Sequence, residues 1–381
     1  MVAMTVYHHQ HHRTNTSSSS TSSDGQVPTT TTTWSSSNQL HGPVVEEIQG
    51  LIKVYKDGHT ERPQIVPSVP PTLLPPDLPV TCKDVIIDPF TNVWARLYVP
   101  LLHHDHDKLI PLLVYFHGGG FCVGSAAWSC YHDFLANLAA KASCLVLSVN
   151  YRLAPENPLP AAYDDGVKAL SWVKTMMRQE EAALDNNNDW ARKCDFNNIF
   201  LGGDSAGANI AHNVSGLIIR RSSDSLLMAI KGTILIQPFF GGHARTASEK
   251  NMTKKTCPLT LDVSDTYWRL SLPEGANRDH PWSNPTTTML FSSGGGLYGK
   301  LDNSNNNNNN NVMVCIAEMD ILKDRNMEFC DALGRAGKRV ERMVYNGVGH
   351  AFHVLDKTQI STTRTTQLIS HIKAFIASLA S

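Results

Sequence analysis

The sequence predicts an α/β fold, in which a mostly parallel, eight-stranded sheet is flanked by helices. Two observations predict it. Several candidate strands are continuous apolar runs, such as 144–150 (CLVLSVN) and 312–317 (VMVCIA), which indicates a sheet buried on both faces. These runs alternate with helical patterns along the chain, as the crossovers of a parallel sheet require. An antiparallel direction stays open for the first strands.

The N-terminal part of the chain differs from the rest. Residues 1–43 are rich in Ser, Thr and His, with Asp24 as the only acidic residue, and such a segment cannot bury enough apolar surface to order itself. A transit peptide would carry more arginine than the single Arg13. We therefore expect residues 1–43 to be a disordered tail and residues 44–381 to be the folded domain.

From Val44 onward the segments have patterns of their own. Residues 44–55 (VVEEIQGLIKVY) form a short amphipathic segment, and Asp57-Gly58 between two extended runs predicts a hairpin. Residues 66–79 contain six prolines and predict a stiff connection. The candidate strands are 82–88, 94–99, 110–116, 144–150, 198–202, 232–237, 312–317 and 340–346. The candidate helices are about 128–142, 161–180, 206–221, 262–271, 324–336 and 361–380.

Two segments predict surface loops. One is 181–190, and the other is the Gly- and Asn-rich insertion 291–311, which ends in seven consecutive asparagines. Neither composition builds a core, so we expect both to be flexible loops.

Composition and charge narrow the class of partner. The chain has 33 Lys and Arg against 34 Asp and Glu, so no basic excess points to nucleic acid or to an anionic membrane surface. No run reaches the ~18 apolar residues that span a bilayer. The eight cysteines are scattered singly, without metal-ligand spacing, which favours free thiols in a reducing compartment. We expect a small, weakly charged partner and a cytoplasmic location.

A candidate nucleophile lies between a strand and a helix. Gly203 and Gly207 enclose Ser205 in a G-x-S-x-G pattern, and the serine of such a turn is exposed only if both glycines let the backbones approach closely. The helix that begins near Ala206 points free N–H groups at a developing oxyanion. The alternative is a tight strand-to-helix turn with an idle serine.

A second motif follows an apolar strand upstream. His117 is followed by Gly118, Gly119 and Gly120, whose N–H groups can converge on one oxygen because no side chain intervenes. A merely flexible loop is the simple alternative. A phosphate cradle is disfavoured because no Lys-Ser/Thr follows the glycines. We interpret His117 as an anchor of this loop rather than as a base.

A serine nucleophile needs a base, and in folds with this turn the order along the chain is serine, acid, histidine. His350 lies in a Gly-flanked loop directly after the last candidate strand, and His353 is its nearest competitor. His212 lies seven residues past Ser205 on the same helix, about 10 Å along the axis, which is too far. We therefore expect His350 to be the base.

The candidate acid is Asp320, at the carboxyl end of the strand 312–317, where sites gather in open α/β sheets. Glu318 is the main alternative, because alternation puts its side chain on the same side as that of Asp320. Asp324 already lies in the next helix, and Asp302 lies in the insertion. Reach favours Asp320, since Glu318 sits about 7 Å further back along the strand.

Other conspicuous residues predict less. The histidine pairs in 8–12 and the HHDHD run at 103–107 are expected to be solvated rather than metal ligands. Cys122 lies two residues beyond the glycine loop, where a reactive thiol would make the protein thiol-sensitive and a packed thiol would not. We expect no metal and no organic cofactor.

Together these motifs resemble the plant carboxylesterases of the hormone-sensitive-lipase-like group. The matching stretches are HGGGF at 117–121, NYRLAPENPLPAAYDD at 150–165, GDSAGAN at 203–209, EMDILKDR at 318–325 and GVGHAF at 347–352. The resemblance covers about residues 44–381, including IKVYKDG near the start and HPWSNP at 280–285, with the poly-Asn insertion outside it. Ala208 departs from the group, in which a second glycine is frequent there.

The resemblance implies an α/β-hydrolase with a helical cap that hydrolyses small carboxylic esters. It implies a catalytic triad of Ser205, Asp320 and His350. It also implies an oxyanion hole from two or three of Gly118, Gly119 and Gly120 together with Ala206. Residues 44–80 and 240–290 would form the cap. Gibberellin receptors share this fold but lack the catalytic histidine. A ligand or hormone receptor with little catalysis is therefore the alternative, and the presence of His350 favours the enzyme.

Deleting residues 1–40 is expected to leave melting temperature and turnover almost unchanged, because a Ser/Thr/His-rich segment contributes nothing to a core. The poly-Asn run 305–311 should be dispensable for the same reason. Thermal melting and an ester assay on the shortened chain are the measurements. A loss of several degrees in melting temperature would contradict the prediction, because it would mean that the tail is tied to the domain.

Overall fold

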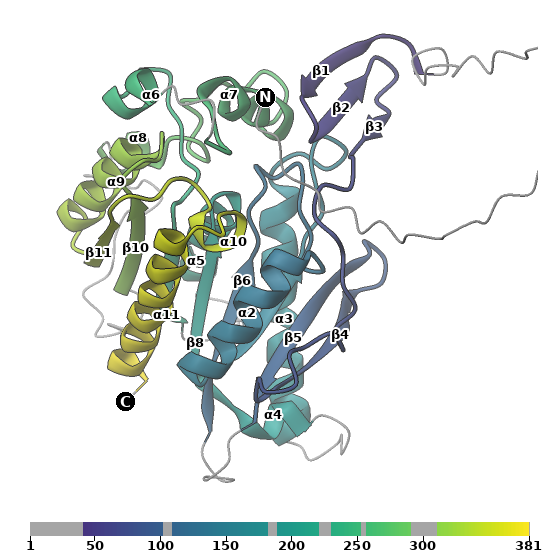
Figure 1. The fold of residues 1–381 in the computed structure, drawn as a ribbon, viewed down its shortest axis with the longest axis vertical. Coiled ribbons are helices and arrows are strands. Elements are labelled where there is room, and N and C mark those ends of the chain that lie inside the picture. Colours follow the sequence, from purple (N-terminus) through teal and green to yellow (C-terminus); the bar gives the residue numbers. More distant parts are fainter. Residues whose placement is uncertain are drawn as a thin grey trace, which may run out of the picture.

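An eight-stranded sheet forms the centre of the molecule (Figure 1). The computed structural model describes residues 41–101, 109–181, 189–220, 230–252, 257–290 and 311–380. The strands of the sheet are β4 Val80–Asp88, β5 Val93–Pro100, β6 Ile110–Phe116, β7 Leu145–Asn150, β8 Cys194–Asp204, β9 Ile230–Ile236, β10 Asn311–Ala317 and β11 Arg339–Tyr345. Their order is β11-β10-β9-β8-β6-β7-β5-β4. Strands β6 to β11 pair in parallel, whereas β5 is antiparallel to both β4 and β7. The predicted α/β class with a mostly parallel eight-stranded sheet is confirmed.

Helices cover both faces of this sheet. Successive side chains of a strand point to opposite faces, so a strand made of apolar residues has an apolar surface on each face that must be buried. Along β6, Leu112, Val114 and Phe116 belong to one apolar cluster, and Leu113 and Tyr115 belong to the other. The first cluster packs against α3 Ala161–Glu181, α5 Ala206–Arg220 and α9 Lys323–Arg335, and the second against α2 Ser129–Ala142 and α11 Gln359–Leu379. Burial on both sides explains why these strands are continuous apolar runs.

The N-terminal segment forms a small antiparallel sheet of its own, made of β1 Val44–Ile48, β2 Ile52–Tyr55 and β3 Thr60–Glu61. The predicted hairpin at Asp57-Gly58 joins β2 to β3, with Gly58 at a φ of 88°. The amphipathic segment 44–55 consists of two paired strands. Its period is two, since burial alternates along β1.

The small sheet and the segment 240–290 both lie at one end of the central sheet, beyond the carboxyl ends of its parallel strands (Figure 1). The segment carries α6 Ala247–Asn251, α7 Leu261–Ser271 and α8 Pro285–Leu290. Arg269 of α7 pairs with Glu46 of β1 at 2.8 Å, so the two segments touch. Arg325 of α9 pairs with Glu249 of α6 at 3.1 Å, and both side chains are buried. These ion pairs connect the segment 240–290 to the small sheet and to α9.

Some predicted features lie outside the described residues: most of the tail at 1–40, the loop at 182–188 and the insertion at 291–310. The sequence patterns missed the short helices α4 Asp189–Lys193, α6, α8 and α10 Phe352–Leu355, which are too short to show a helical period. Helix α4 begins inside the expected loop 181–190, and its Trp190 is buried, so that part of the loop expectation was wrong. Among the described helices, none is both long enough and apolar enough to cross a membrane.

Candidate active site

Ser205 occupies a sharp turn between β8 and α5. Its φ of 52° is left-handed, a conformation that L-residues other than glycine adopt at a cost in free energy. The flanking glycines are required by space. A Cβ on Gly207 would lie 1.9 Å from the carbonyl oxygen of Phe116, and one on Gly203 would lie 2.4 Å from the carbonyl carbon of Gly207. The turn therefore presses the start of α5 against the end of β6 and presents the serine above the sheet.

The structure brings Ser205, Asp320 and His350 together. His350 Nε2 lies 3.0 Å from Ser205 Oγ, and His350 Nδ1 lies 2.7 Å from Asp320 Oδ2. Asp320 Oδ1 also accepts a hydrogen bond from the Leu322 amide at 3.0 Å. All three side chains are buried, with exposed fractions of 6% for Ser205, 1% for Asp320 and 7% for His350. A hydroxyl, an imidazole and a carboxylate thus form one hydrogen-bonded chain.

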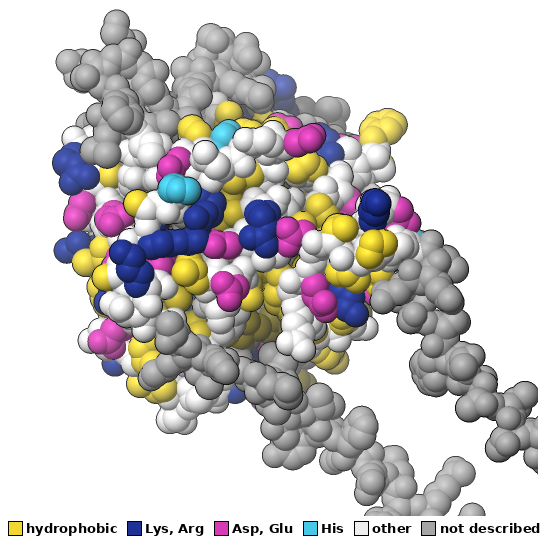
Figure 2. All heavy atoms as spheres, turned by 90° about the horizontal axis from the view of Figure 1, so that it is seen from above, with side chains coloured by type: hydrophobic (Ala, Val, Ile, Leu, Met, Phe, Trp, Pro, Cys, Tyr) yellow, Lys and Arg dark blue, Asp and Glu magenta, His cyan; other side chains and the backbone are white. Residues whose placement is uncertain are grey.

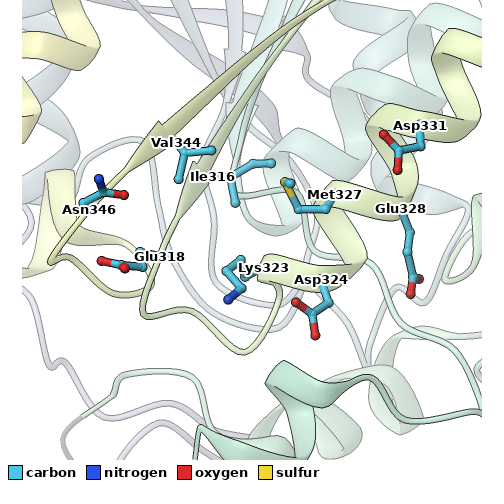
Figure 3. A pocket seen from close by; sticks show the side chains of 9 residues that line it. All are labelled: Ile316, Glu318, Lys323, Asp324, Met327, Glu328, Asp331, Val344 and Asn346. Carbon is cyan, nitrogen blue, oxygen red and sulfur yellow. The ribbon is translucent and has the colours of Figure 1, made fainter.

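The alternative acids make other contacts. Glu318 is exposed, and its Oε2 accepts from the Gly347 amide at 2.8 Å. Asp324 Oδ2 accepts from the Ser248 amide at 2.7 Å. Figure 3 shows both carboxylates on the wall of a surface groove between α9 and the ends of β10 and β11. Asp302 lies outside the described residues. Of the candidate acids that the structure describes, Asp320 is the one on His350 Nδ1.

The alternative bases are packed in the core. His353 lies edge-on to the Phe134 ring at 4.8 Å, and burial lowers the pKa of His353 to about 3. His212 lies edge-on to Phe329 at 5.0 Å, and burial likewise lowers its pKa to about 3. Both imidazoles are therefore neutral near pH 7, and the imidazole that lies within hydrogen-bonding distance of Ser205 Oγ is that of His350.

The glycine loop is held by its first residues. His117 stacks on Tyr151 with ring centroids 4.4 Å apart, and its Nδ1 lies 2.7 Å from Gly118 O. Burial lowers the pKa of His117 to about 4, so it serves as a neutral anchor. The Gly118 amide already donates to Tyr131 at 2.9 Å. Within the described chain, the amides of Gly119 and Gly120 have no such partner.

Sequence reasoning missed Asp204, the residue before the nucleophile. Its carboxylate accepts from the Tyr115 hydroxyl at 2.8 Å, the Tyr131 hydroxyl at 3.0 Å and the Gly118 amide at 3.1 Å. Burial raises the pKa of Asp204 to about 6, and these hydrogen bonds oppose that rise. Asp204 therefore fastens the glycine loop to the turn that carries Ser205. Asp204 belongs to the GDSAG motif, but its neighbours in the sequence do not indicate that it contacts Tyr115, Tyr131 and Gly118.

Cys122 is fully buried behind the glycine loop, and burial raises the pKa of its thiol. A protonated and inaccessible thiol is a poor nucleophile. The interpretation of Cys122 as a packed thiol is therefore the one that its surroundings favour.

Comparisons with known proteins identify the family of this chain. A family model described as the alpha/beta hydrolase fold matches residues 113–354. Probable carboxylesterase 6 of Arabidopsis thaliana is 52% identical over 343 residues, which cover 90% of this chain and 94% of that protein. Tuliposide A-converting enzyme 1 of Tulipa gesneriana, described as chloroplastic, is 35% identical over 338 residues, or 88% of this chain and 79% of the enzyme.

Solved structures show the same fold. An esterase from Pyrobaculum calidifontis superposes with a TM-score of 0.60 at 26% identity, over 77% of this chain and 84% of that one. Carboxyl esterase 2 from Tuber melanosporum has a TM-score of 0.61 at 22% identity, over 80% and 89% of the two chains. With the family match and the identity to plant relatives, the chain belongs to the plant carboxylesterases of the hormone-sensitive-lipase-like α/β-hydrolase family and is a carboxylic-ester hydrolase.

Proposed function

We propose that this enzyme hydrolyses small carboxylic esters through an acyl-enzyme on Ser205. His350 Nε2 takes the proton of the Ser205 hydroxyl as Oγ attacks the ester carbonyl carbon. Asp320 holds the imidazole by Nδ1 and stabilises the imidazolium that forms. The observation that carries this proposal is the buried chain of hydrogen bonds from Ser205 through His350 to Asp320.

The second half of the cycle uses the same residues. The tetrahedral intermediate collapses, and the imidazolium gives its proton to the departing alkoxide, which leaves as the alcohol. Water then attacks the acyl carbonyl while His350 takes one of its protons. Collapse releases the carboxylic acid and returns the proton to Ser205 Oγ.

Backbone amides would receive the oxyanion in both steps. In the part of the chain that the structure describes, the N–H groups of Gly119 and Gly120 are unpaired. Ala206 lies in the first turn of α5, where N–H groups lack partners within the helix. The Gly118 amide is engaged by Tyr131 and Asp204, which supports an anchoring role for this glycine. We therefore assign the oxyanion hole to Gly119, Gly120 and Ala206.

Residues 44–80 and 240–290 are proposed to form the cap over the site. The small sheet β1–β3 and helices α6–α8 lie at the end of the central sheet that carries Ser205 (Figure 1). The chain that leads into β4 runs to the opposite end, where Val80 pairs with Pro100, so the expected N-terminal cap segment 44–80 extends too far. The Tyr267 ring is so near that a Cβ on Gly120 would lie 2.3 Å from it, and Trp268 stacks on Phe239 at 4.5 Å. Aromatic rings this close to the glycine loop favour small apolar acyl groups.

The charges on the outer surface at the Ser205 end of the molecule are consistent with an uncharged substrate. Figure 2 looks down on it, and acidic and basic side chains lie interspersed there. Asp265, for example, pairs with both Arg245 and Arg278. A surface of mixed sign does not steer a strongly charged ligand.

We further propose a cytoplasmic location. All eight cysteines are free, which supports a reducing compartment. Fluorescence imaging of the full chain fused to a reporter tests the location, and a signal confined to chloroplasts would overturn it.

A panel of p-nitrophenyl esters with increasing acyl length is the test of the proposed function. We expect turnover of the short esters, with kcat/KM falling as the acyl chain lengthens, because the Tyr267 ring packs directly against Gly120 of the glycine loop. Aryl amides and lactones run in parallel separate ester hydrolysis from related reactions. A ligand receptor on this scaffold would bind its ligand but turn over none of the panel, and that outcome would overturn the proposal.

A further inference from the structure

Gln237 stands directly after β9 in a left-handed conformation, with a φ of 47°. The described chain has six non-glycine residues with positive φ, and four of them surround the candidate site. These four are Phe121, Ser205, Gln237 and Ala351. Such conformations cost free energy and persist where the surrounding contacts enforce them, often at functional sites. Gln237 belongs to this group although no sequence motif marks it.

The backbone around Gln237 is attached to the turn that carries Ser205. The Ser205 amide donates to Ile236 O at 2.8 Å, and the Phe239 amide donates to Ser205 O at 2.9 Å. The Gln237 amide itself donates to Cys315 O of β10 at 2.7 Å. The segment 236–239 therefore bridges the strand that ends at the nucleophile and the strand that leads to Asp320.

The side chain of Gln237 reaches the other two members of the triad. It is 1% exposed, and its Nε2 donates to Asp320 Oδ2 at 3.0 Å and to Gly349 O at 3.0 Å. Its Oε1 accepts from the Ala351 amide at 2.9 Å. Two acceptors face the nitrogen and one donor faces the oxygen, so the orientation of the amide is determined by its partners.

These three bonds hold His350 from both sides. Gly349 and Ala351 are its chain neighbours, and Asp320 Oδ2 is the atom that also contacts His350 Nδ1. One amide thus sets the position of the carboxylate oxygen and of the backbone on either side of the imidazole. A glutamine can do this because it has a donor and an acceptor at the end of one side chain.

We propose that Gln237 is a positioning residue for ester hydrolysis, which holds Asp320 and the His350 loop in register with Ser205. The inference rests on the triad proposed above. Gln237 touches no substrate atom in this role. It acts through the imidazole, whose displacement by about 1 Å can reduce a rate by about 10²-fold.

The test replaces Gln237 by methionine, which has a similar length and no hydrogen-bonding amide. We expect Gln237→Met to lower kcat by about 10- to 100-fold, with KM of a short p-nitrophenyl ester within about twofold of its normal value. The rate at which diisopropyl fluorophosphate labels Ser205 should fall in parallel, because that reaction needs the same activated hydroxyl. Mass spectrometry measures the labelling, and circular dichroism checks the fold.

A second variant decides if the methionine variant fails to fold. Gln237→Glu keeps the shape and the acceptor for the Ala351 amide, but a carboxyl group has at most one proton to replace the two donors of Nε2. It also brings a second ionisable group against Asp320, and two adjacent carboxyl groups cannot both ionise freely. We expect it to fold and to lose at least as much kcat as the methionine variant does. A folded Gln237→Glu protein with normal kcat would overturn the proposal.

Asn326 offers a matched control. It is also 1% exposed, and its Nδ2 donates to Pro238 O at 2.8 Å, so it supports the same segment without touching the triad. Asn326→Met should keep kcat within about threefold. An equal loss of kcat in this control would reduce Gln237 to a structural role and overturn the inference. Turnover that survives Ser205→Ala would instead refute the triad itself, so the two failures are distinguishable.

Discussion

Replacing Ser205 by alanine is expected to lower ester turnover by about 10³- to 10⁶-fold while the protein stays folded. The substitution removes the oxygen that attacks the carbonyl, whose partner is His350 Nε2 at 3.0 Å. Alanine has the same backbone preferences at a φ of 52°, so the turn should survive. The measurements are kcat on a p-nitrophenyl ester and the melting temperature.

Ser148 is a suitable control for this variant. It is fully buried in β7, and its hydroxyl has no hydrogen-bond partner among the described residues, so Ser148→Ala should change turnover little. A folded Ser205→Ala protein with near-normal turnover would contradict the assignment of the nucleophile.

Replacing Asp320 by asparagine is expected to cost about 10⁴-fold in turnover. Asp320 accepts hydrogen bonds from Gln237 and Leu322 as well as holding His350 Nδ1. If the asparagine NH₂ is turned toward His350 Nδ1, it favours the histidine tautomer that carries its proton on Nε2. In that tautomer Nε2 cannot accept the proton of Ser205. In either orientation of the amide, the imidazolium loses its counter-charge.

Glu318→Gln is the matched comparison for Asp320→Asn, and it should cost far less. Glu318 lies two residues earlier, is exposed, and contacts the Gly347 amide rather than the imidazole. Parallel measurements of kcat and melting temperature on the two variants compare the two carboxylates directly. An equal loss of turnover in both would contradict the assignment of Asp320 as the acid.

The sheet was predictable because burial on both faces leaves a strong local signal. The candidate strand 110–116 matches β6 residue for residue, since neither face tolerates polar side chains there. The turn at Ser205 was predictable because it needs glycine at 203 and 207, where other residues would collide with β6. Both signals are local in the chain.

The parts of the site that escaped prediction depend on contacts between distant segments. Gln237 contacts Asp320, 83 residues away, and Ala351, 114 residues away. Asp204 accepts a hydrogen bond from the Gly118 amide at a separation of 86 residues, and Gly118 is one of the glycines expected in the oxyanion hole. The local sequence around a polar residue at the end of a strand does not indicate whether the fold will bring such distant partners to it.

The order of the strands has a consequence for how the enzyme gains its activity during folding. Ser205 and His350 are separated by 145 residues, and the glycine loop, the nucleophile, Gln237 and Asp320 follow β6, β8, β9 and β10 in turn. Contacts between such distant segments form late, because the long loops between them must first lose their entropy. Helices and isolated strand pairs can arise earlier without any catalytic power. We therefore expect esterase activity to appear only when the whole sheet has formed. In a refolding experiment, the return of activity should follow the last strands that pair.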